Sequence, residues 1–250
     1  MELSNKTFLI TGGATGIGLA LATALYKKGS KIKICGRRKE RLEQVKELFP
    51  EIDILVCDLS YKAQRIELYE WATSDGRLDV LVNNAGTQRT FLYNESHVED
   101  YDSGDNEIEI NLMAPIHLCE LFIPFLMKNE SAAIVNISSS LAIVHEISFP
   151  VYCASKAAIH TFTRCLREQL ANSSVKVFGL IPPAVTSEIN PEGRAVKPPP
   201  VLMPTDEYAA YVIKGLEADI YEINPANFAE RENKSLKELY EYFKNPNNPR

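Results

Sequence analysis

Short apolar segments alternate with helix-length amphipathic segments from residue 7 to about residue 181, and this alternation is the strongest constraint on the fold. The strand-like runs are 8–10, 32–35, 52–56, 78–82, 133–137 and 175–180, and the helix-like stretches that follow the first five are 17–28, 39–48, 64–71, 107–127 and 151–170. Apolar strands joined through helices form right-handed βαβ units, whose sheet is parallel and covered on both faces. The sequence therefore predicts an α/β fold, a doubly wound parallel sheet in a Rossmann-type three-layer αβα arrangement, with ligands at the carboxyl ends of the strands.

The chain length suits one large domain or two small ones, and we expect a single domain over residues 1–250. A proline-rich segment, 191–204, interrupts the pattern, because proline continues neither a helix nor a central strand. It is either a surface loop or a lid over a site. Further elements are predicted as a short strand at 221–223, helices at 205–216 and 236–243, and a frayed polar tail at about 245–250.

The composition argues against several classes of partner. A formal net charge of −6 does not favour binding to nucleic acid or to an anionic membrane surface. No apolar run is expected to span a membrane, and no signal peptide is visible. The cysteines are odd in number and include no CxxC pair, so neither a disulfide framework nor a metal site is predicted, and a cytoplasmic location is expected. Cys35 and Cys57 end strand-like runs and are interpreted as small buried hydrophobic residues.

Tyr152 and Lys156 lie four residues apart in a stretch that is predicted to be helical, so both side chains share one face. A neighbouring ammonium group stabilises the phenolate and lowers the tyrosine pKa from its ordinary value near ~10. A tyrosine tuned in this way can exchange a proton with a substrate hydroxyl or carbonyl near neutral pH. The alternative is an ordinary amphipathic helix with a surface tyrosine and lysine.

A glycine loop connects the first predicted strand to the first predicted helix, with the sequence Gly12-Gly13-Ala14-Thr15-Gly16-Ile17-Gly18. Glycines let the backbone turn sharply and approach a pyrophosphate, which the helix N-terminus attracts. In this strand–loop–helix context the loop indicates dinucleotide binding, the alternative being a plain glycine turn.

Arg37 and Arg38 follow the second predicted strand, where a dinucleotide site discriminates between cofactors. An aspartate there would bind the adenosine ribose and repel a 2′-phosphate, whereas two guanidinium groups can clamp that phosphate. The sequence therefore favours NADP(H) over NAD(H). The alternative is that both arginines only open a charged helix.

Together these motifs resemble the short-chain dehydrogenase/reductase family over residues 6 to about 190. The segment 11–18 matches the TGxxxGIG loop of the family, 83–86 matches its NNAG signature, and Tyr152 with Lys156 matches YxxxK. Ser139 precedes Tyr152 by 13 residues, which is the spacing usual in the family.

The resemblance implies four catalytic residues. Tyr152 would be the general acid or base, and Lys156 would lower its pKa and hold the nicotinamide ribose. Ser139 would polarise the substrate oxygen, while Ser138 would face the other side of the strand and serve packing. Asn111 would hold a water molecule of a proton relay, the alternative being a capped or kinked helix position.

The resemblance also implies the contacts of the cofactor. Asp58 would lie near the adenine, and Val185 would meet the nicotinamide carboxamide through its backbone. Either Thr186 or Ser187 would contact the cofactor. The expected cofactor-binding residues are Gly12, Thr15, Gly16, Ile17, Gly18, Arg37, Arg38, Asp58, Leu59, Asn84, Ala85, Gly86, Tyr152, Lys156, Pro182, Val185 and Ser187.

The chain departs from the family pattern in two places. Pro182 is followed by Pro183 where a glycine is usual, which restricts the backbone beside the nicotinamide. The glycine pair of a tetramer-forming seventh strand is missing at 221–225. A homodimer through the helices that contain Asn111 and Tyr152 is therefore expected, with a tetramer as the alternative.

The substrate is expected near Thr87, Gln88 and Arg89, near the segment 139–152, and near a substrate loop at about 188–204. An apolar wall is predicted from Ile143, Val144, Ile147 and Phe149. His145 is either a second acid/base or an ordinary loop histidine. Arg89 either attracts an acidic substrate or is solvated.

More loosely, the segments 69–72 and 150–154 resemble an oxidoreductase subgroup associated with bacterial D-alanine transfer operons, the DltE-like proteins. The function favoured is interconversion of a small-molecule carbonyl and a secondary alcohol by hydride transfer. Lyase or epimerase chemistry on the same scaffold and a non-catalytic NADP(H)-binding regulator are the alternatives.

Overall fold

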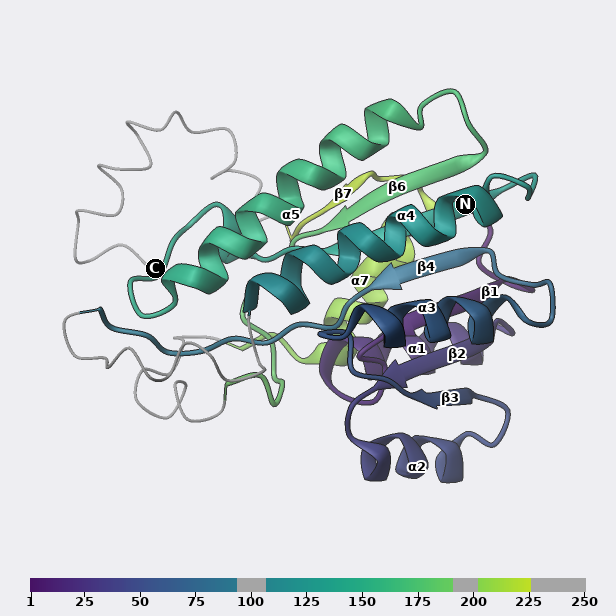
Figure 1. Cartoon of the computed structure of the whole chain (residues 1–250), viewed down its shortest axis with the longest axis horizontal. Helices are drawn as coiled ribbons and strands as arrows, with labels where there is room; N and C mark the ends of the chain where they lie inside the picture. The colour runs from purple at the N-terminus through teal and green to yellow at the C-terminus, as the bar shows by residue number, and fades with distance from the viewer. Residues whose placement is uncertain (94–106, 191–201, 226–250) are drawn as a thin grey trace.

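Seven strands form one parallel sheet in the computed structural model of the protein, which describes residues 1–93, 107–190 and 202–225 (Figure 1). The strand order is β3-β2-β1-β4-β5-β6-β7, so the chain starts in the middle of the sheet and builds outward in both directions. The strands are β1 (Thr7–Thr11), β2 (Lys31–Gly36), β3 (Asp53–Val56), β4 (Val80–Asn83), β5 (Ala132–Ile137), β6 (Val175–Leu180) and β7 (Glu222–Ile223). The predicted doubly wound parallel sheet is confirmed, and β7 provides the short strand expected at 221–223.

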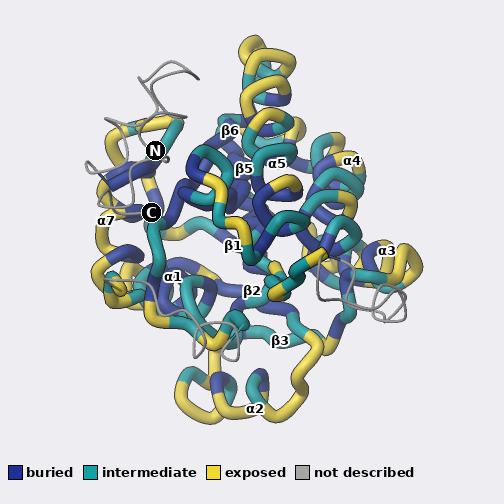
Figure 2. Tube along the Cα trace, turned by 90° about the vertical axis from the view of Figure 1, so that its left-hand side faces the viewer, coloured by how far each residue is buried: buried dark blue, intermediate teal, exposed yellow. Residues whose placement is uncertain are grey.

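Helices cover both faces of the sheet. Their bounds are α1 (Gly16–Lys27), α2 (Lys39–Leu48), α3 (Lys62–Thr73), α4 (Ala114–Leu126), α5 (Pro150–Gln169) and α7 (Thr205–Glu217). Helices α1, α2 and α7 pack into the core on one face, and α3, α4 and α5 into the core on the other. Figure 2 shows the buried residues gathered along the sheet and on the helix sides that face it. This is the predicted three-layer αβα arrangement.

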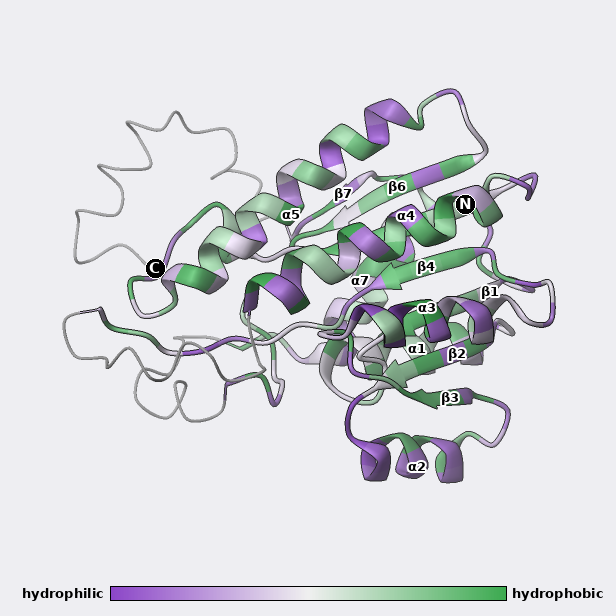
Figure 3. Cartoon of the chain, in the orientation of Figure 1, coloured by the Kyte–Doolittle hydropathy of each residue, from purple (hydrophilic) through white to green (hydrophobic). Residues whose placement is uncertain are grey.

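The hydrophobic pattern explains where each element lies. All residues of β1 are buried, as a central parallel strand with covered faces requires. Helix α2 is mostly hydrophilic (Figure 3). Its buried residues, Leu42 and Val45, lie three apart and pack into the core. Pro150 occupies the first turn of α5, where the missing N–H of proline costs no hydrogen bond.

The predicted helix at 107–127 differs from the structure in its form. A π-helical turn, η2 (Glu109–Met113), precedes α4, so the stretch is not a uniform α-helix. The predicted helix at 236–243, the tail at 245–250 and residues 191–201 of the substrate loop lie outside the described residues.

The stretch Glu109–Leu126 corrects the expectation that no apolar run could span a membrane. Its 18 residues have a mean hydropathy of 1.3, which satisfies the length and composition of a membrane span. In the fold, Leu118, Phe122 and Leu126 on this stretch are fully buried in the core beneath the sheet. A core helix of this kind meets the same length and composition criteria, so the stretch is weak support for a membrane location.

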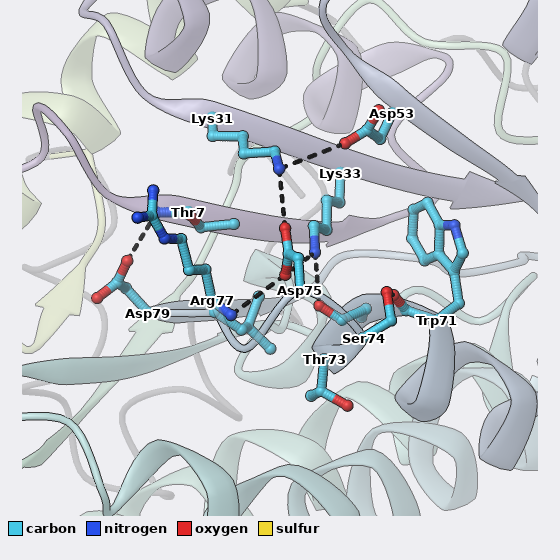
Figure 4. Close-up of polar contacts among 12 residues, drawn as sticks. Thr7, Lys31, Lys33, Asp53, Trp71, Thr73, Ser74, Asp75, Arg77 and Asp79 are labelled. Carbon is cyan, nitrogen blue, oxygen red and sulfur yellow. Dashed lines mark hydrogen bonds and ion pairs between the residues drawn. The ribbon is translucent and has the colours of Figure 1, made fainter.

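A buried lysine marks the amino-terminal edge of β2. The Lys33 ammonium group donates to the Ala72 carbonyl at 2.7 Å and to Asp75 Oδ1 at 2.8 Å, and Lys31 pairs with Asp75 Oδ2 at 2.8 Å (Figure 4). Burial alone would raise the pKa of Asp75, but hydrogen bonds from Lys31 and Lys33 hold it well below its ordinary value. Asp75 therefore supplies the counter-charge that lets β2 carry a lysine in its buried part.

Asp75→Asn is expected to lower the free energy of unfolding by about 2 kcal/mol, because Lys33 loses its counter-ion but keeps a polar neighbour. Urea unfolding at pH 7 measures the loss. A carboxylate with a depressed folded pKa stabilises above its unfolded pKa of roughly 4, so the difference from wild type should shrink as the pH falls below that value. Asp53→Asn is the matched control, since Asp53 meets Lys31 only at 3.9 Å. Equal losses in both variants would contradict this account of Lys33.

Candidate active site

A cavity of about 860 Å³ opens at the carboxyl ends of the strands and is lined by residues that follow β1 to β6. The predicted site residues in its wall are Gly12, Thr15, Gly16, Ile17, Arg37, Arg38, Asp58, Leu59, Asn84, Ala85, Gly86, Ser139, Tyr152, Lys156, Pro182, Val185 and Ser187. Gly18 and Asn111 lie outside the wall that the described part of the chain forms. One cavity thus brings together segments that lie far apart in the sequence.

The glycine loop combines left-handed backbone with close packing. Gly12 and Gly16 have φ values of 63° and 56°, which side chains other than that of glycine rarely adopt. A Cβ atom at Gly18 would lie 2.4 Å from the Gly12 carbonyl oxygen and 2.5 Å from Asn84 Nδ2. Gly18 therefore lets α1 approach the loop, and its contact with a cofactor stays a prediction.

The N-terminus of α1 is suited to bind an anion. Among the described residues no side chain caps this end, and the hydroxyl of the N-cap residue Thr15 instead accepts a hydrogen bond from Arg38 Nη2 at 3.1 Å. The first amides of a helix need partners and carry the positive end of the helix dipole. The cavity wall at Gly16 and Ile17 therefore fits a phosphate group.

Thr11 holds the glycine loop against the segment that follows β4, a role that the sequence analysis missed. Its Oγ1 accepts from the backbone N–H groups of Asn84 and Ala85, both at 3.0 Å. In return, Asn84 Nδ2 donates to the carbonyls of Thr11 at 2.8 Å and Gly12 at 3.1 Å. This exchange fixes the cavity wall between β1 and β4.

Tyr152 and Lys156 are buried on the same face of α5, as their spacing predicted. The Lys156 ammonium group lies 5.7 Å from the centroid of the Tyr152 ring and donates to the Ile137 carbonyl at 2.9 Å. Burial lowers the pKa of Lys156 to about 8. A Cβ atom at Gly86 would come within 3.5 Å of Lys156 Nζ, so Gly86 keeps the space beside the amine open.

The serines after β5 have separate roles. Ser139 Oγ accepts from the Leu141 N–H at 3.1 Å at the start of a short 3-10 turn, η3 (Ser140–Ala142), and lines the cavity. Because this oxygen accepts that bond, its own hydrogen remains a donor for a partner in the cavity. Ser138 Oγ donates to the Lys156 carbonyl at 2.9 Å and ties β5 to α5.

The side chain of Asn111 is held by protein contacts, and its role in a water relay stays a prediction. Its Oδ1 accepts from the Thr87 N–H at 2.9 Å, and its Nδ2 donates to the Thr87 carbonyl at 2.8 Å and to Ser155 Oγ at 3.1 Å. It lies in the π-helical turn Glu109–Met113. The amide joins the segment after β4 to α5, and is thereby committed to protein contacts.

Residues after β2 and β3 line the other end of the cavity. Arg37 and Arg38 are in the wall, and the Arg38 guanidinium also pairs with Glu188 at 2.7 Å. Asp58 Oδ1 accepts from the backbone N–H of Ser60 at 2.9 Å and from its hydroxyl at 2.8 Å. Cys35 and Cys57 are buried, as predicted.

The expected substrate end of the cavity is only partly as predicted. Val144 and Phe149 line it, whereas Ile143 and Ile147 lie outside the wall that the described residues form, and Ile147 is 63% exposed. Leu141 contributes to the apolar wall as well. The predicted residues Thr87, Gln88 and His145 also line the cavity. So do Glu146, from the predicted segment 139–152, and Glu188, Ile189, Asn190 and Met203, from the predicted substrate loop at about 188–204.

Arg89 lies outside the cavity wall of the described residues, and its N–H donates to Glu107 Oε1 at 3.0 Å. Burial raises the pKa of Glu107. Of the two candidates after β6, Ser187 lines the cavity and Thr186 bonds through its N–H to the Met203 carbonyl at 3.0 Å. The strands' carboxyl ends were predictable, but these loop contacts carry no periodic sequence signal.

The fold and the cavity define an α/β protein of the dinucleotide-binding class. The sequence model described as short chain dehydrogenase matches residues 6–197, and the chain belongs to this family. It is 43% identical over 225 residues to the uncharacterized oxidoreductase DltE of Bacillus subtilis, covering 89% of each chain. An uncharacterized oxidoreductase of Staphylococcus aureus is 31% identical over 77% of this chain and 85% of its own. The protein is therefore an oxidoreductase of the short-chain dehydrogenase/reductase family with DltE-like resemblance.

Solved structures share this fold. A short chain dehydrogenase of Burkholderia cenocepacia in complex with NADP is 28% identical, with a TM-score of 0.79 and 92% of each chain covered. A short-chain dehydrogenase of Sphingobium yanoikuyae in complex with NADPH is 26% identical, with a TM-score of 0.78 and 88% of each chain covered. A short chain dehydrogenase of Burkholderia phymatum in complex with NAD is 24% identical, with a TM-score of 0.84 over 100% of this chain and 99% of its own.

Proposed function

We propose that this protein interconverts a small carbonyl compound and the corresponding secondary alcohol, with NADP(H) as the preferred cofactor. One observation carries the proposal: a single cavity contains Tyr152, Lys156 and Ser139 at one end and the glycine loop with Arg38 at the other. The similar structures in complex with NADP, NADPH and NAD support a nicotinamide cofactor in this cavity.

The residues present fit such a cofactor. The uncapped N-terminus of α1 would hold the pyrophosphate, and Asp58 and Leu59 would lie at the adenine end. Gly86 leaves room beside Lys156, which would hold the nicotinamide ribose. When bound, the cofactor supplies or accepts the hydride.

Side chains of the protein would carry out the proton transfer. Ser139 donates a hydrogen bond to the substrate oxygen, and Tyr152 gives that oxygen a proton during reduction or removes one during oxidation. Lys156, when protonated, stabilises the phenolate of Tyr152 across the short separation between amine and ring. Burial of this cluster strengthens each of these electrostatic interactions.

Arg37→Ala combined with Arg38→Ala is expected to weaken NADPH binding at least about tenfold while NADH binding changes by less than about threefold. The reason is the loss of charge-assisted hydrogen bonds to the 2′-phosphate. Fluorescence titration of wild type and variant with both cofactors measures the effect.

The control for this titration is Lys128→Ala combined with Lys214→Ala, which removes two exposed positive charges elsewhere on the surface. Wild-type NADH binding as tight as NADPH binding would contradict the NADP(H) preference. Stoichiometric loss of NADPH absorbance with a carbonyl substrate separates hydride transfer from lyase or epimerase chemistry, and turnover of any kind excludes a purely regulatory role.

A further inference from the structure

Glu188, in the segment that follows β6, pairs with two arginines at the start of α2. Its Oε2 accepts from Arg38 Nη1 at 2.7 Å, and its Oε1 accepts from Arg41 Nη2 at 2.8 Å. Arg38 also donates to Thr15 Oγ1 at 3.1 Å. One carboxylate therefore links the segment after β6, the glycine loop and the start of α2.

This contact lies at the end of the cavity where the adenosine part of a dinucleotide is expected. Arg38 and Glu188 both line the cavity. The preceding residue, Ser187, lies over the glycine loop, because a Cβ atom at Gly16 would be 3.3 Å from Ser187 Cβ. The hydrogen bond from Arg38, together with the charge of Arg41, lowers the pKa of Glu188, so this side chain is an anion at neutral pH.

A carboxylate and a phosphate monoester compete for the same guanidinium donors. Both accept paired N–H hydrogen bonds, but the phosphate brings more charge and a third acceptor oxygen. The existing contact is also easy to exchange, since the side chains of Glu188 and Arg38 are 46% and 54% exposed. A phosphate arriving at Arg38 would meet the repulsion of Glu188 until that carboxylate moves away.

We propose that Glu188 is an internal substitute for the cofactor 2′-phosphate: it holds Arg38 and Arg41 before binding, and the 2′-phosphate of NADP(H) displaces it. NAD(H), which lacks this phosphate, leaves the contact in place. Glu188 is then a specificity-determining residue, because its carboxylate competes with the 2′-phosphate for the two arginines and so weakens the binding of NADP(H) but not of NAD(H). The inference rests on the proposed function in one respect, namely that the 2′-phosphate binds at Arg38.

The segment that contains Glu188 also reaches the substrate end of the cavity. The next residue, Ile189, packs against the cluster formed by Phe149, Tyr152 and Cys153. Asn190 Nδ2 then donates to Thr90 Oγ1 at 3.2 Å, in the segment after β4. Glu188 is therefore followed directly in the chain by two residues, Ile189 and Asn190, that line the same cavity as Tyr152.

The test is Glu188→Gln, which keeps the size of the side chain and removes its charge. Two ligand pairs differ by the 2′-phosphate: NADPH against NADH, and adenosine 2′,5′-bisphosphate against 5′-AMP. We expect Glu188→Gln to tighten binding of NADPH and of the bisphosphate about fivefold and to leave NADH and 5′-AMP within about twofold. Glu217→Gln is the matched control, since Glu217 pairs with Lys28 at 2.7 Å at similar exposure, and it should change none of the four affinities.

Unchanged or weaker binding of both 2′-phosphorylated ligands to Glu188→Gln would overturn the inference, whatever the wild-type preference. Equal tightening of all four ligands would also overturn it, because Glu188 would then act as a general negative charge. A different result would contradict the proposed cofactor preference: wild-type protein would bind NADH as tightly as NADPH. If Glu188→Gln restored a preference for NADPH in that case, the inference would stand and the wild-type preference would be explained by Glu188.

Discussion

Tyr152→Phe is expected to lower kcat by about a thousandfold while NADPH binding stays within about twofold of wild type. The phenol is the group assigned to proton transfer, and general acid–base catalysis contributes roughly 10²–10⁴ to a rate. The ring that packs with Phe149 and Cys153 is retained, so the core around it is preserved. Steady-state kinetics and a fluorescence titration with NADPH separate the two effects.

Tyr69→Phe is the matched control for this variant. Tyr69 lies on α3 in edge-to-face contact with Phe122, away from the cavity wall, so the loss of its hydroxyl should leave kcat unchanged. Thermal unfolding of both variants verifies that they remain folded. A Tyr152→Phe enzyme that retains more than about a tenth of wild-type kcat would show that another group transfers the proton.

Lys156→Met is expected to abolish most turnover and, at the same time, to raise the free energy of unfolding by about 2 kcal/mol. Lys156 is buried, and burial lowers its pKa from 10.5 to about 8, which means that folding disfavours its charged form. Its hydrogen bond to the Ile137 carbonyl offsets only part of this cost. The buried charge of Lys156 therefore lowers stability, which is consistent with the catalytic role proposed for it.

The lowered pKa of Lys156 determines how the stability difference between wild type and Lys156→Met changes with pH. Below pH 8 the folded protein carries the full cost of the buried charge, and between pH 8 and about 10.5 the folded state loses its proton before the unfolded state does. Wild-type stability should therefore rise over this interval relative to Lys156→Met, and the advantage of the variant should disappear above it. Urea unfolding of both proteins at pH 7, 9 and 10.5 measures the difference.

Lys33→Met is the comparison variant for Lys156→Met. Lys33 is as well buried as Lys156, but it has Asp75 as a counter-ion at 2.8 Å, so removing its charge takes away the buried one of the two ammonium groups that pair with this carboxylate and leaves Asp75 only Lys31. We expect this variant to be less stable than wild type at every pH at which Asp75 is ionised. A stability gain in Lys33→Met, or a loss in Lys156→Met, would contradict the difference drawn between paired and unpaired buried lysines.

The elements and the main motifs of this protein are properties of local sequence. The strand and helix pattern, the glycine loop and the Tyr152–Lys156 spacing each depend on residues within one or two turns or one strand. Parallel βαβ connection then forces the carboxyl ends of the strands, and whatever residues follow them, to one edge of the sheet. This is why most of the cavity wall could be predicted without coordinates.

Contacts between distant segments were decided by the tertiary structure alone. The sequence did not indicate that the Asn111 amide meets Thr87 and Ser155, which lie 24 and 44 residues away. Glu188 was predicted only as the first residue of a substrate loop. It meets Arg38, 150 residues away in the sequence, because the segment after β6 passes over the glycine loop. Hydrophobic periodicity and residue spacing report which face of an element is buried. They do not report which polar groups meet across loops, because that depends on how the elements pack in three dimensions.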